Sequence, residues 1–264
     1  MNYYFMVMID GLEGVVTLAN FPPKDKQVPW PPKQIAYVLW SDGKNWQFRD
    51  LDHLEPGALK SFKSSELPND YPGDVTPFFC LSPEKFPSQI RELPESNLME
   101  TTPAWRANIQ IMSPHTSVSY QGEYPQAMLS ISKGSILSLG TLLQSGQGIS
   151  NKFIFPNLHK SPRISSYKLS FLKMRSQEII MTACVRSNDT SVIDLGPLDV
   201  SDKEPIVVTA IGTSGIPIFF SHDKDFKYMS FEHTHPPMEM LFLGQRYKHQ
   251  RNMKNWWLKK GLKT

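Results

Sequence analysis

Two histidines and a glutamate form the most suggestive cluster of chemically active residues in the sequence. His233 and His235 are separated by one residue, and Glu239 follows in the same stretch. If a strand runs through His233 and His235, both imidazoles point to the same side of it. Two imidazoles and a carboxylate suit zinc, iron or manganese. The pattern predicts a transition-metal site; the alternative is that the histidines form hydrogen bonds at a strand end and the protein needs no cofactor.

The order His-x-His-x3-Glu in residues 233–239 resembles part of the first metal-binding motif of the cupins. The resemblance covers only this stretch. Lys227 stands where the cupin motif has a glycine, and a basic segment follows where the family has a second histidine motif. The resemblance implies metal ligation by His233, His235 and Glu239. A metal held there would activate water, which is the chemistry of a metal-dependent enzyme.

Aromatic residues in proline-flanked positions are a second group of candidates. Trp30 and Tyr124 each lie beside a proline, which indicates loops. Flat aromatic rings on a β-sandwich commonly contact sugars or peptides. The sequence therefore predicts Trp30 and Tyr124 as ligand-stacking residues, with a carbohydrate or a protein as the ligand; the alternative is that these rings pack in the core.

Signals for a nucleophile or a phosphate site are poor. Residues 212–215, Gly-Thr-Ser-Gly, lack the order of a nucleophile elbow and are expected to form a hairpin turn. The two cysteines, Cys80 and Cys184, are far apart and are expected to pack as small buried side chains. These patterns name no reaction.

The stretch that begins at residue 236 predicts an amphipathic, basic helix. Pro236 and Pro237 suit a first helical turn and Gly261 suits a stop, so the helix is expected over 236–260. At 100° per residue its apolar and basic side chains fall on opposite faces. The apolar face is expected to hold Met238, Phe242, Met253, Trp256 and Trp257.

This helix can dock on the protein's own sandwich, lie on an anionic membrane or in a partner's groove, or bind nucleic acid. After Glu239 the sequence has no acidic residue, and the chain before residue 246 has 21 basic residues against 25 acidic ones. The net charge of +3 is therefore local to the helix. The residues expected to contact a partner or a membrane are Arg246, Lys248, Arg251, Lys254, Trp256, Trp257, Lys259 and Lys260.

The elements that position these residues are expected to be strands. From residue 101 onward, short runs alternate apolar and polar residues, as in Ala107 to Ile111, which is typical of half-buried strands. Residues 206–211 are apolar on both faces and predict a central strand. The predicted fold is all-β, mainly an antiparallel sandwich, with a C-terminal amphipathic α-helix.

Three segments are expected: a Pro-rich β or irregular segment over 1–100, the sandwich over 101–235, and the basic helix over 236–264. No apolar run is long enough to span a bilayer and the first residues do not resemble a signal peptide, so the protein is expected to be cytoplasmic. The favoured interpretation is a non-enzymatic binding or assembly protein, with a protein partner or a second copy of the chain as further expected partners.

Overall fold

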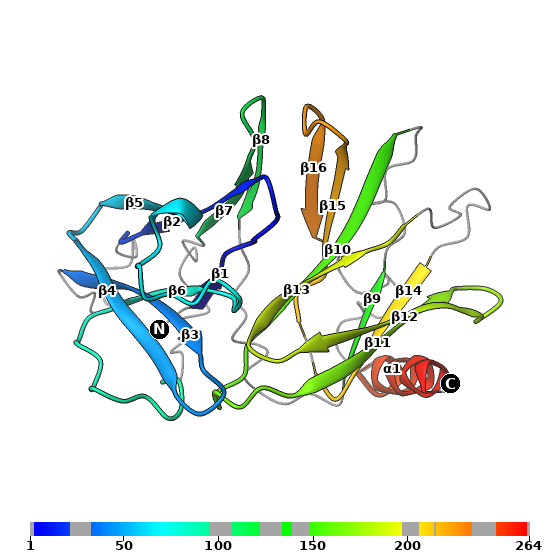
Figure 1. Cartoon of the computed structure of the whole chain (residues 1–264). Coiled ribbons are helices and arrows are strands. Elements are labelled where there is room, and N and C mark those ends of the chain that lie inside the picture. Colours follow the sequence, from blue (N-terminus) through cyan, green and yellow to red (C-terminus); the bar gives the residue numbers. More distant parts are fainter. Residues whose placement is uncertain are drawn as a thin grey trace. The chain divides into compact units, whose positions relative to one another are not determined.

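The computed structural model describes residues 3–21, 33–94, 107–121, 134–138, 148–196, 206–213, 215–233 and 247–262 (Figure 1). Within these ranges, antiparallel strands dominate and an α-helix follows them, so the predicted all-β class with a C-terminal helix is confirmed. The chain divides into two compact units. Unit 1 consists of residues 1–130 and 158–164, and unit 2 consists of residues 131–157 and 165–264.

Unit 1 contains two four-stranded antiparallel sheets. The first has the order β1-β6-β3-β4, from Tyr3–Phe5, Phe78–Ser82, Gln34–Ser41 and Trp46–Leu54. The second has the order β5-β2-β7-β8, from Leu59–Lys63, Glu13–Ala19, Asn108–Met112 and Ser117–Gln121. A short 3-10 helix, η1 (Ser64–Glu66), follows β5. The stretch 50–63 forms the end of β4, a turn and β5.

Period-two patterning sets the two faces of the second sheet. In β7, Ile109 and Ile111 are buried and Asn108 is exposed, as the alternation predicts. The buried side chains face the first sheet, where the Phe62 ring of β5 stacks on the Phe79 ring of β6 at 5.9 Å. The opposite face of the second sheet is polar.

The central strand β3 of the first sheet is covered on both faces, since all eight of its residues are buried. The stretch 83–94 supplies part of the cover: the Phe86 ring stacks on Tyr37 at 4.3 Å, and Ile90 pairs with Trp46. The Pro-rich stretch 66–94 therefore wraps a neighbouring surface and also contributes the central strand β6.

Residues 158–164 also belong to unit 1, although the strands on either side of them belong to unit 2. Their backbone accepts three hydrogen bonds from unit 1. Trp46 Nε1 and Leu93 N donate to the Lys160 carbonyl at 3.0 and 2.9 Å, and Ser41 Oγ donates to the Pro162 carbonyl. The chain thus returns to unit 1 between two strands of unit 2.

Unit 2 also contains two four-stranded antiparallel sheets. One has the order β13-β10-β15-β16, from Asp189–Asp194, Ile149–Asn157, Ile218–Asp223 and Met229–His233. The other has the order β12-β11-β14-β9, from Ile179–Arg186, Ser166–Lys173, Ile206–Ile211 and Gly134–Ser138. As predicted, β14 is a central strand, paired with β11 and β9.

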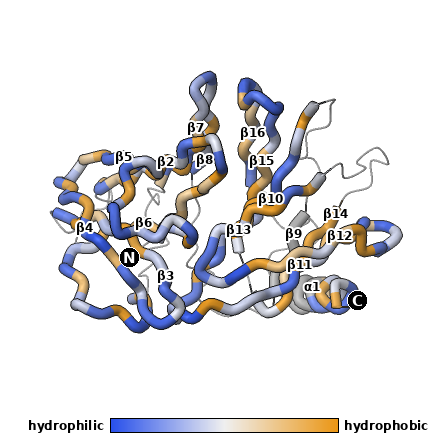
Figure 2. The backbone as a smooth tube through the Cα atoms, viewed as in Figure 1, coloured by the Kyte–Doolittle hydropathy of each residue, from blue (hydrophilic) through white to orange (hydrophobic). Residues whose placement is uncertain are grey.

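Phenylalanines join the two sheets of unit 2 in one core. The Phe153 ring of β10 lies 5.5 Å from Phe171 of β11 and 5.2 Å from Phe219 of β15. Leu169 and Val208 belong to the same buried cluster. The hydrophobic colour along β14 in Figure 2 marks the strand whose two faces are both covered. Unit 2 is therefore an antiparallel sandwich.

The residues 212–215 were expected to form a hairpin turn, and this expectation is wrong. β14 and β15 belong to different sheets, so the chain crosses from one sheet of unit 2 to the other here. A Cβ on Gly215 would lie 2.4–2.7 Å from atoms of the buried Phe155 ring. Glycine is required at this crossing because the backbone passes directly against that ring.

The helix α1 (Tyr247–Gly261) lies on the outer face of the sheet β12-β11-β14-β9, against β14, β9 and β11 (Figure 1). Trp257 and Leu258 form a buried cluster with Leu172 and Val207 of that face. The helix ends at Gly261, where a stop is predicted, and the expected start near residue 236 lies outside the described residues. Docking on the protein's own sheet is therefore observed.

The segment boundaries expected at residues 100 and 235 differ from those of the compact units. β7 and β8 follow residue 100 but belong to a sheet of unit 1, in which β7 pairs with β2 and β8 pairs with β7. Helix α1 is part of unit 2 and shares a buried cluster with its strands. Strand partners that lie far apart in the chain determine the units.

Candidate functional site

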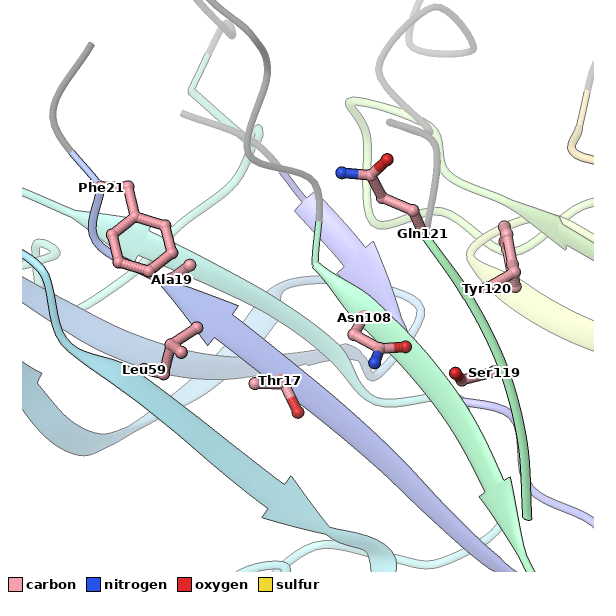
Figure 3. Close-up of a pocket in the computed structure, with 8 residues that line it drawn as sticks. All are labelled: Thr17, Ala19, Phe21, Leu59, Asn108, Ser119, Tyr120 and Gln121. Carbon is pink, nitrogen blue, oxygen red and sulfur yellow. The ribbon is translucent and has the colours of Figure 1, made fainter. Parts of the chain in front are cut away.

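An open pocket of about 490 Å³ lies on the polar face of the sheet β5-β2-β7-β8 in unit 1 (Figure 3). It is lined by Thr17, Ala19, Phe21, Leu59, Asn108, Ser119, Tyr120 and Gln121. These residues come from all four strands and, in the case of Phe21, from the second position after β2. The paired strands provide a floor on which side chains keep a fixed spacing.

A row of polar side chains crosses the strands in this pocket. Thr17 is opposite Asn108, and Asn108 is opposite Gln121, so the three point outward from β2, β7 and β8 in one line. Neighbouring strands are about 4.8 Å apart, so the row is roughly 10 Å long. On β5, Ser61 extends it, with its Oγ 2.7 Å from Thr17 Oγ1.

Apolar side chains gather at one end of the pocket. Figure 3 shows Phe21, Ala19 and Leu59 on one side, with Asn108, Ser119 and Gln121 on the other. Leu59 is exposed, and Phe21 is half-buried. None of the described residues that line the pocket is charged. The pocket therefore suits a neutral ligand with both an apolar surface and hydrogen-bonding groups.

The amide groups determine what hydrogen bonds the pocket offers. Asn108 and Gln121 each present an acceptor oxygen and a donor NH₂ group, and the hydroxyls of Thr17 and Ser119 both donate and accept. Adjacent donors and acceptors on a flat floor complement a ligand whose own hydroxyls also do both. Sequence reasoning missed this set, although the alternation in residues 107–111 places Asn108 on an outward face.

The residues predicted to stack on a ligand lie outside the described residues. Trp30 belongs to the stretch of the chain that follows Phe21, and Tyr124 to the stretch that follows Gln121. Both therefore remain predictions. Phe21 and Gln121, the residues that precede these stretches, line the pocket.

Of the predicted metal ligands, the structure describes His233 alone. It ends β16 opposite Ile218 and is half-buried, whereas His235 and Glu239 lie outside the described residues. Among the described residues, no group of three or more histidine, cysteine, aspartate or glutamate side chains could hold a metal ion. The predicted site at His233, His235 and Glu239 stays a prediction.

His222 is a buried histidine in a separate place. Its ring lies between Phe220 and Phe226, at centroid distances of 5.1 and 4.6 Å, and its Nδ1 lies 2.8 Å from the Asp223 carbonyl. In the sheet, His222 pairs with Met229 and His233 pairs with Ile218. This register offsets the two histidines by four positions along β15, or about 13 Å, so they cannot share one compact site.

Asp223, Lys224 and Asp225 lie at the turn that follows β15. It joins β15 to β16, and Asp223 Oδ1 accepts hydrogen bonds from the backbone N–H groups of Lys227 and Tyr228 at 2.8 and 3.2 Å. Lys224 and Asp225 are exposed. This carboxylate stabilises the turn and contributes to no site.

Trp256 and Trp257 were both expected on the apolar face of α1, but of these two tryptophans only Trp257 is buried. Trp257 is 5% exposed, whereas Trp256 is 38% exposed and carries Lys260 Nζ 5.1 Å above its ring centroid. Lys259 is exposed. Arg246 and the side chains of Lys248, Arg251 and Lys254 lie outside the described set. The buried apolar face contains Leu258, which the helical projection did not select.

The two cysteines differ from each other. Cys80 is buried as expected, and burial raises the pKa of its thiol. The expectation for Cys184 is wrong, because this side chain is exposed on β12, whose outer positions face solvent. Cys80 is held in its unreactive thiol form.

In the part of the chain that the structure describes, no helix is both long and apolar enough to cross a membrane. Comparison with known protein families, with characterised proteins and with solved structures finds no match to this chain.

Proposed function

We propose that this protein is a non-enzymatic binding protein whose ligand is a neutral carbohydrate, held on the polar face of the sheet β5-β2-β7-β8. The observation that carries the proposal is the cross-strand row of Thr17, Asn108 and Gln121 beside Phe21 and Leu59. A sugar ring has hydroxyls at its rim and C–H groups on its faces, so it uses both parts of such a surface.

The chemistry of the lining favours a carbohydrate over an anionic ligand. Phosphate and carboxylate ligands are usually held by arginine, lysine or a helix N-terminus. The described lining offers amides, hydroxyls, an aromatic ring and aliphatic groups instead. Amide and hydroxyl groups exchange hydrogen bonds with sugar hydroxyls at little desolvation cost, because both partners are neutral.

The test is a screen of the full chain against neutral oligosaccharides, followed by titration calorimetry on the ones that bind. Replacing Asn108 or Gln121 with alanine removes neutral hydrogen bonds and should weaken binding about three- to tenfold for each residue. Replacing Phe21 with alanine should weaken binding by a similar factor through lost apolar contact.

Ser117→Ala is the matched control. Ser117 is exposed on the same strand as Gln121 but lies at the other end of it, outside the pocket lining. Binding by this variant should equal that of the unaltered protein. The proposal would be contradicted if no neutral oligosaccharide bound. It would also be contradicted if the double variant Asn108→Ala/Gln121→Ala bound as well as the unaltered protein. Binding of extended peptides instead would indicate a protein ligand.

A further inference from the structure

Helix α1 has an outward face that the proposed carbohydrate pocket does not use. Its inward residues are Trp257, Leu258 and Gly261, all buried, with Met253 packed against the same cluster. Among the side chains that the structure describes in the helix and the turn that ends it, the exposed ones are Asn252, Asn255, Trp256, Lys259 and Leu262. Docking on the sheet thus leaves one stripe of the helix facing solvent.

Two large apolar side chains lie on this outward face. Trp256 is 38% exposed and Leu262 is 58% exposed. Leaving such side chains in water forgoes the free energy that their burial would gain. Trp256 lies in the last turns of α1 and Leu262 is the turn residue that follows Gly261, so the two exposed side chains lie near the same end of the helix.

Cationic groups accompany these apolar side chains. Lys259 is exposed, and Lys260 Nζ lies 5.1 Å above the Trp256 ring, which keeps the ammonium group at the outward face. The helix sequence from Tyr247 to Gly261 also includes Lys248, Arg251 and Lys254 and no acidic residue. The outward face therefore combines tryptophan, leucine and concentrated positive charge.

We propose that the outward face of α1, defined by Trp256, Lys259, Lys260 and Leu262, binds the surface of an anionic phospholipid membrane. Tryptophan favours the interface between headgroups and acyl chains, and leucine gains free energy there. Lysine side chains attract anionic headgroups. Because the apolar cluster of Trp257 and Leu258 is already buried on the protein's own sheet, the contact is shallow and reversible.

Charge and apolarity together favour a lipid surface over nucleic acid. Nucleic acid would use the positive charge and could stack a base on Trp256, but it offers no counterpart for Leu262. An anionic bilayer satisfies the cations and both apolar side chains at once. This inference does not depend on the carbohydrate pocket, which lies in unit 1.

The test is co-sedimentation of the full chain with vesicles of phosphatidylcholine, with or without phosphatidylserine. Binding is expected only to the vesicles with phosphatidylserine, and high salt should weaken it. Replacing Lys259 and Lys260 together with glutamine should weaken binding about 25-fold, since each basic group near an anionic leaflet contributes roughly fivefold. Trp256→Ala should also weaken it, with unchanged thermal stability.

The matched control is the double substitution of Lys224 and Lys227 with glutamine. These lysines are exposed in the β15–β16 turn, so the net charge changes equally without altering α1. This control should bind like the unaltered protein. The proposal would be overturned if the control lost as much vesicle binding as the Lys259/Lys260 variant. Binding to pure phosphatidylcholine vesicles, or binding to RNA but not to vesicles, would also overturn it.

Discussion

Gly261 is the residue at which α1 comes closest to its sheet. A Cβ at this position would lie 2.2 Å from Thr209 Oγ1 and 3.5 Å from Ser170 Cβ. Ser170 Oγ donates a hydrogen bond to the Gly261 carbonyl at 2.9 Å, which satisfies a carbonyl at the helix end. Glycine at this position therefore allows a close approach to the sheet as well as marking the stop that its place in the sequence predicts.

Gly261→Ala is expected to destabilise the protein by about 1–3 kcal/mol through overpacking against Thr209. Alanine favours a helix more than glycine does, so the loss can come only from the contact. Adding Thr209→Ala should restore most of it, because this change removes the Oγ1 atom that the new methyl group would strike. Urea denaturation of the two single variants and the double variant measures the coupling. Purely additive effects would refute this explanation.

At the same scale, sequence reasoning identified which residues point outward but not which of them meet. The alternation around Ile109 places Asn108 and Gln110 on the exposed face, and the structure agrees for Asn108. That Thr17 lies beside Asn108 follows from pairing between β2 and β7, which are far apart in the chain. The periodicity of a strand indicates which face each residue lies on, but it does not indicate which residues of another strand lie beside it.

The helix α1 shows how far an element can be predicted from its own residues. Its basic character and its end at Gly261 follow from the sequence. The exact buried stripe does not, because small rotations about the helix axis exchange neighbouring positions between the sheet and solvent. The packing of Leu172 and Val207 selects Trp257 and Leu258.

Two adjacent tryptophans provide a direct test of this orientation. Trp257→Ala removes a buried side chain and should cost about 3–5 kcal/mol. Trp256→Ala removes an exposed one and should change stability by no more than about 0.5 kcal/mol. Thermal unfolding followed by circular dichroism compares the pair. Equal losses for both variants would mean that the helix docks through a different stripe.

Among strands, short-range patterns located many of the elements of unit 2 to within a few residues. The sequence has runs of strand-forming residues at 178–186, 190–195 and 206–211, and these correspond to β12, β13 and β14. The expected turn at 212–215 was wrong because two successive strands entered different sheets. A turn between strands looks the same in sequence whether it closes a hairpin or crosses the core.

For the whole molecule, the division into units could not be predicted from composition. The change of texture near residue 100 reflects fewer prolines and has no counterpart in a unit boundary, since β2 and β7 on either side of it share a sheet. Nothing in residues 158–164 indicates that they leave the sandwich to join unit 1. Their hydrogen bonds to Trp46, Leu93 and Ser41 are visible only in three dimensions.

This returning segment is expected to make stability depend on pH. Burial lowers the pKa of His159 below its ordinary value of 6.5, because desolvation disfavours the imidazolium. The contribution of the neutral ring is complete above pH 6.5 and is lost as the pH falls through the lower pKa of the folded state.

Denaturation of the unaltered protein and of His159→Asn, measured between neutral and mildly acidic pH, tests this expectation. The unaltered protein should lose stability steadily across that range, and the variant should lose less of it, because asparagine does not titrate. Parallel pH profiles for the two proteins would show that His159 gains no proton on unfolding.

The return of residues 158–164 to unit 1 also limits where genetic recombination can divide the gene for this chain. A gene fragment that ends near residue 130 omits part of unit 1, and one that begins there takes with it residues on which Trp46 and Leu93 depend. No single recombination point yields two self-sufficient pieces. Genetic exchange should therefore pass the two units on together, and descendants that carry one unit without the other should be selected against.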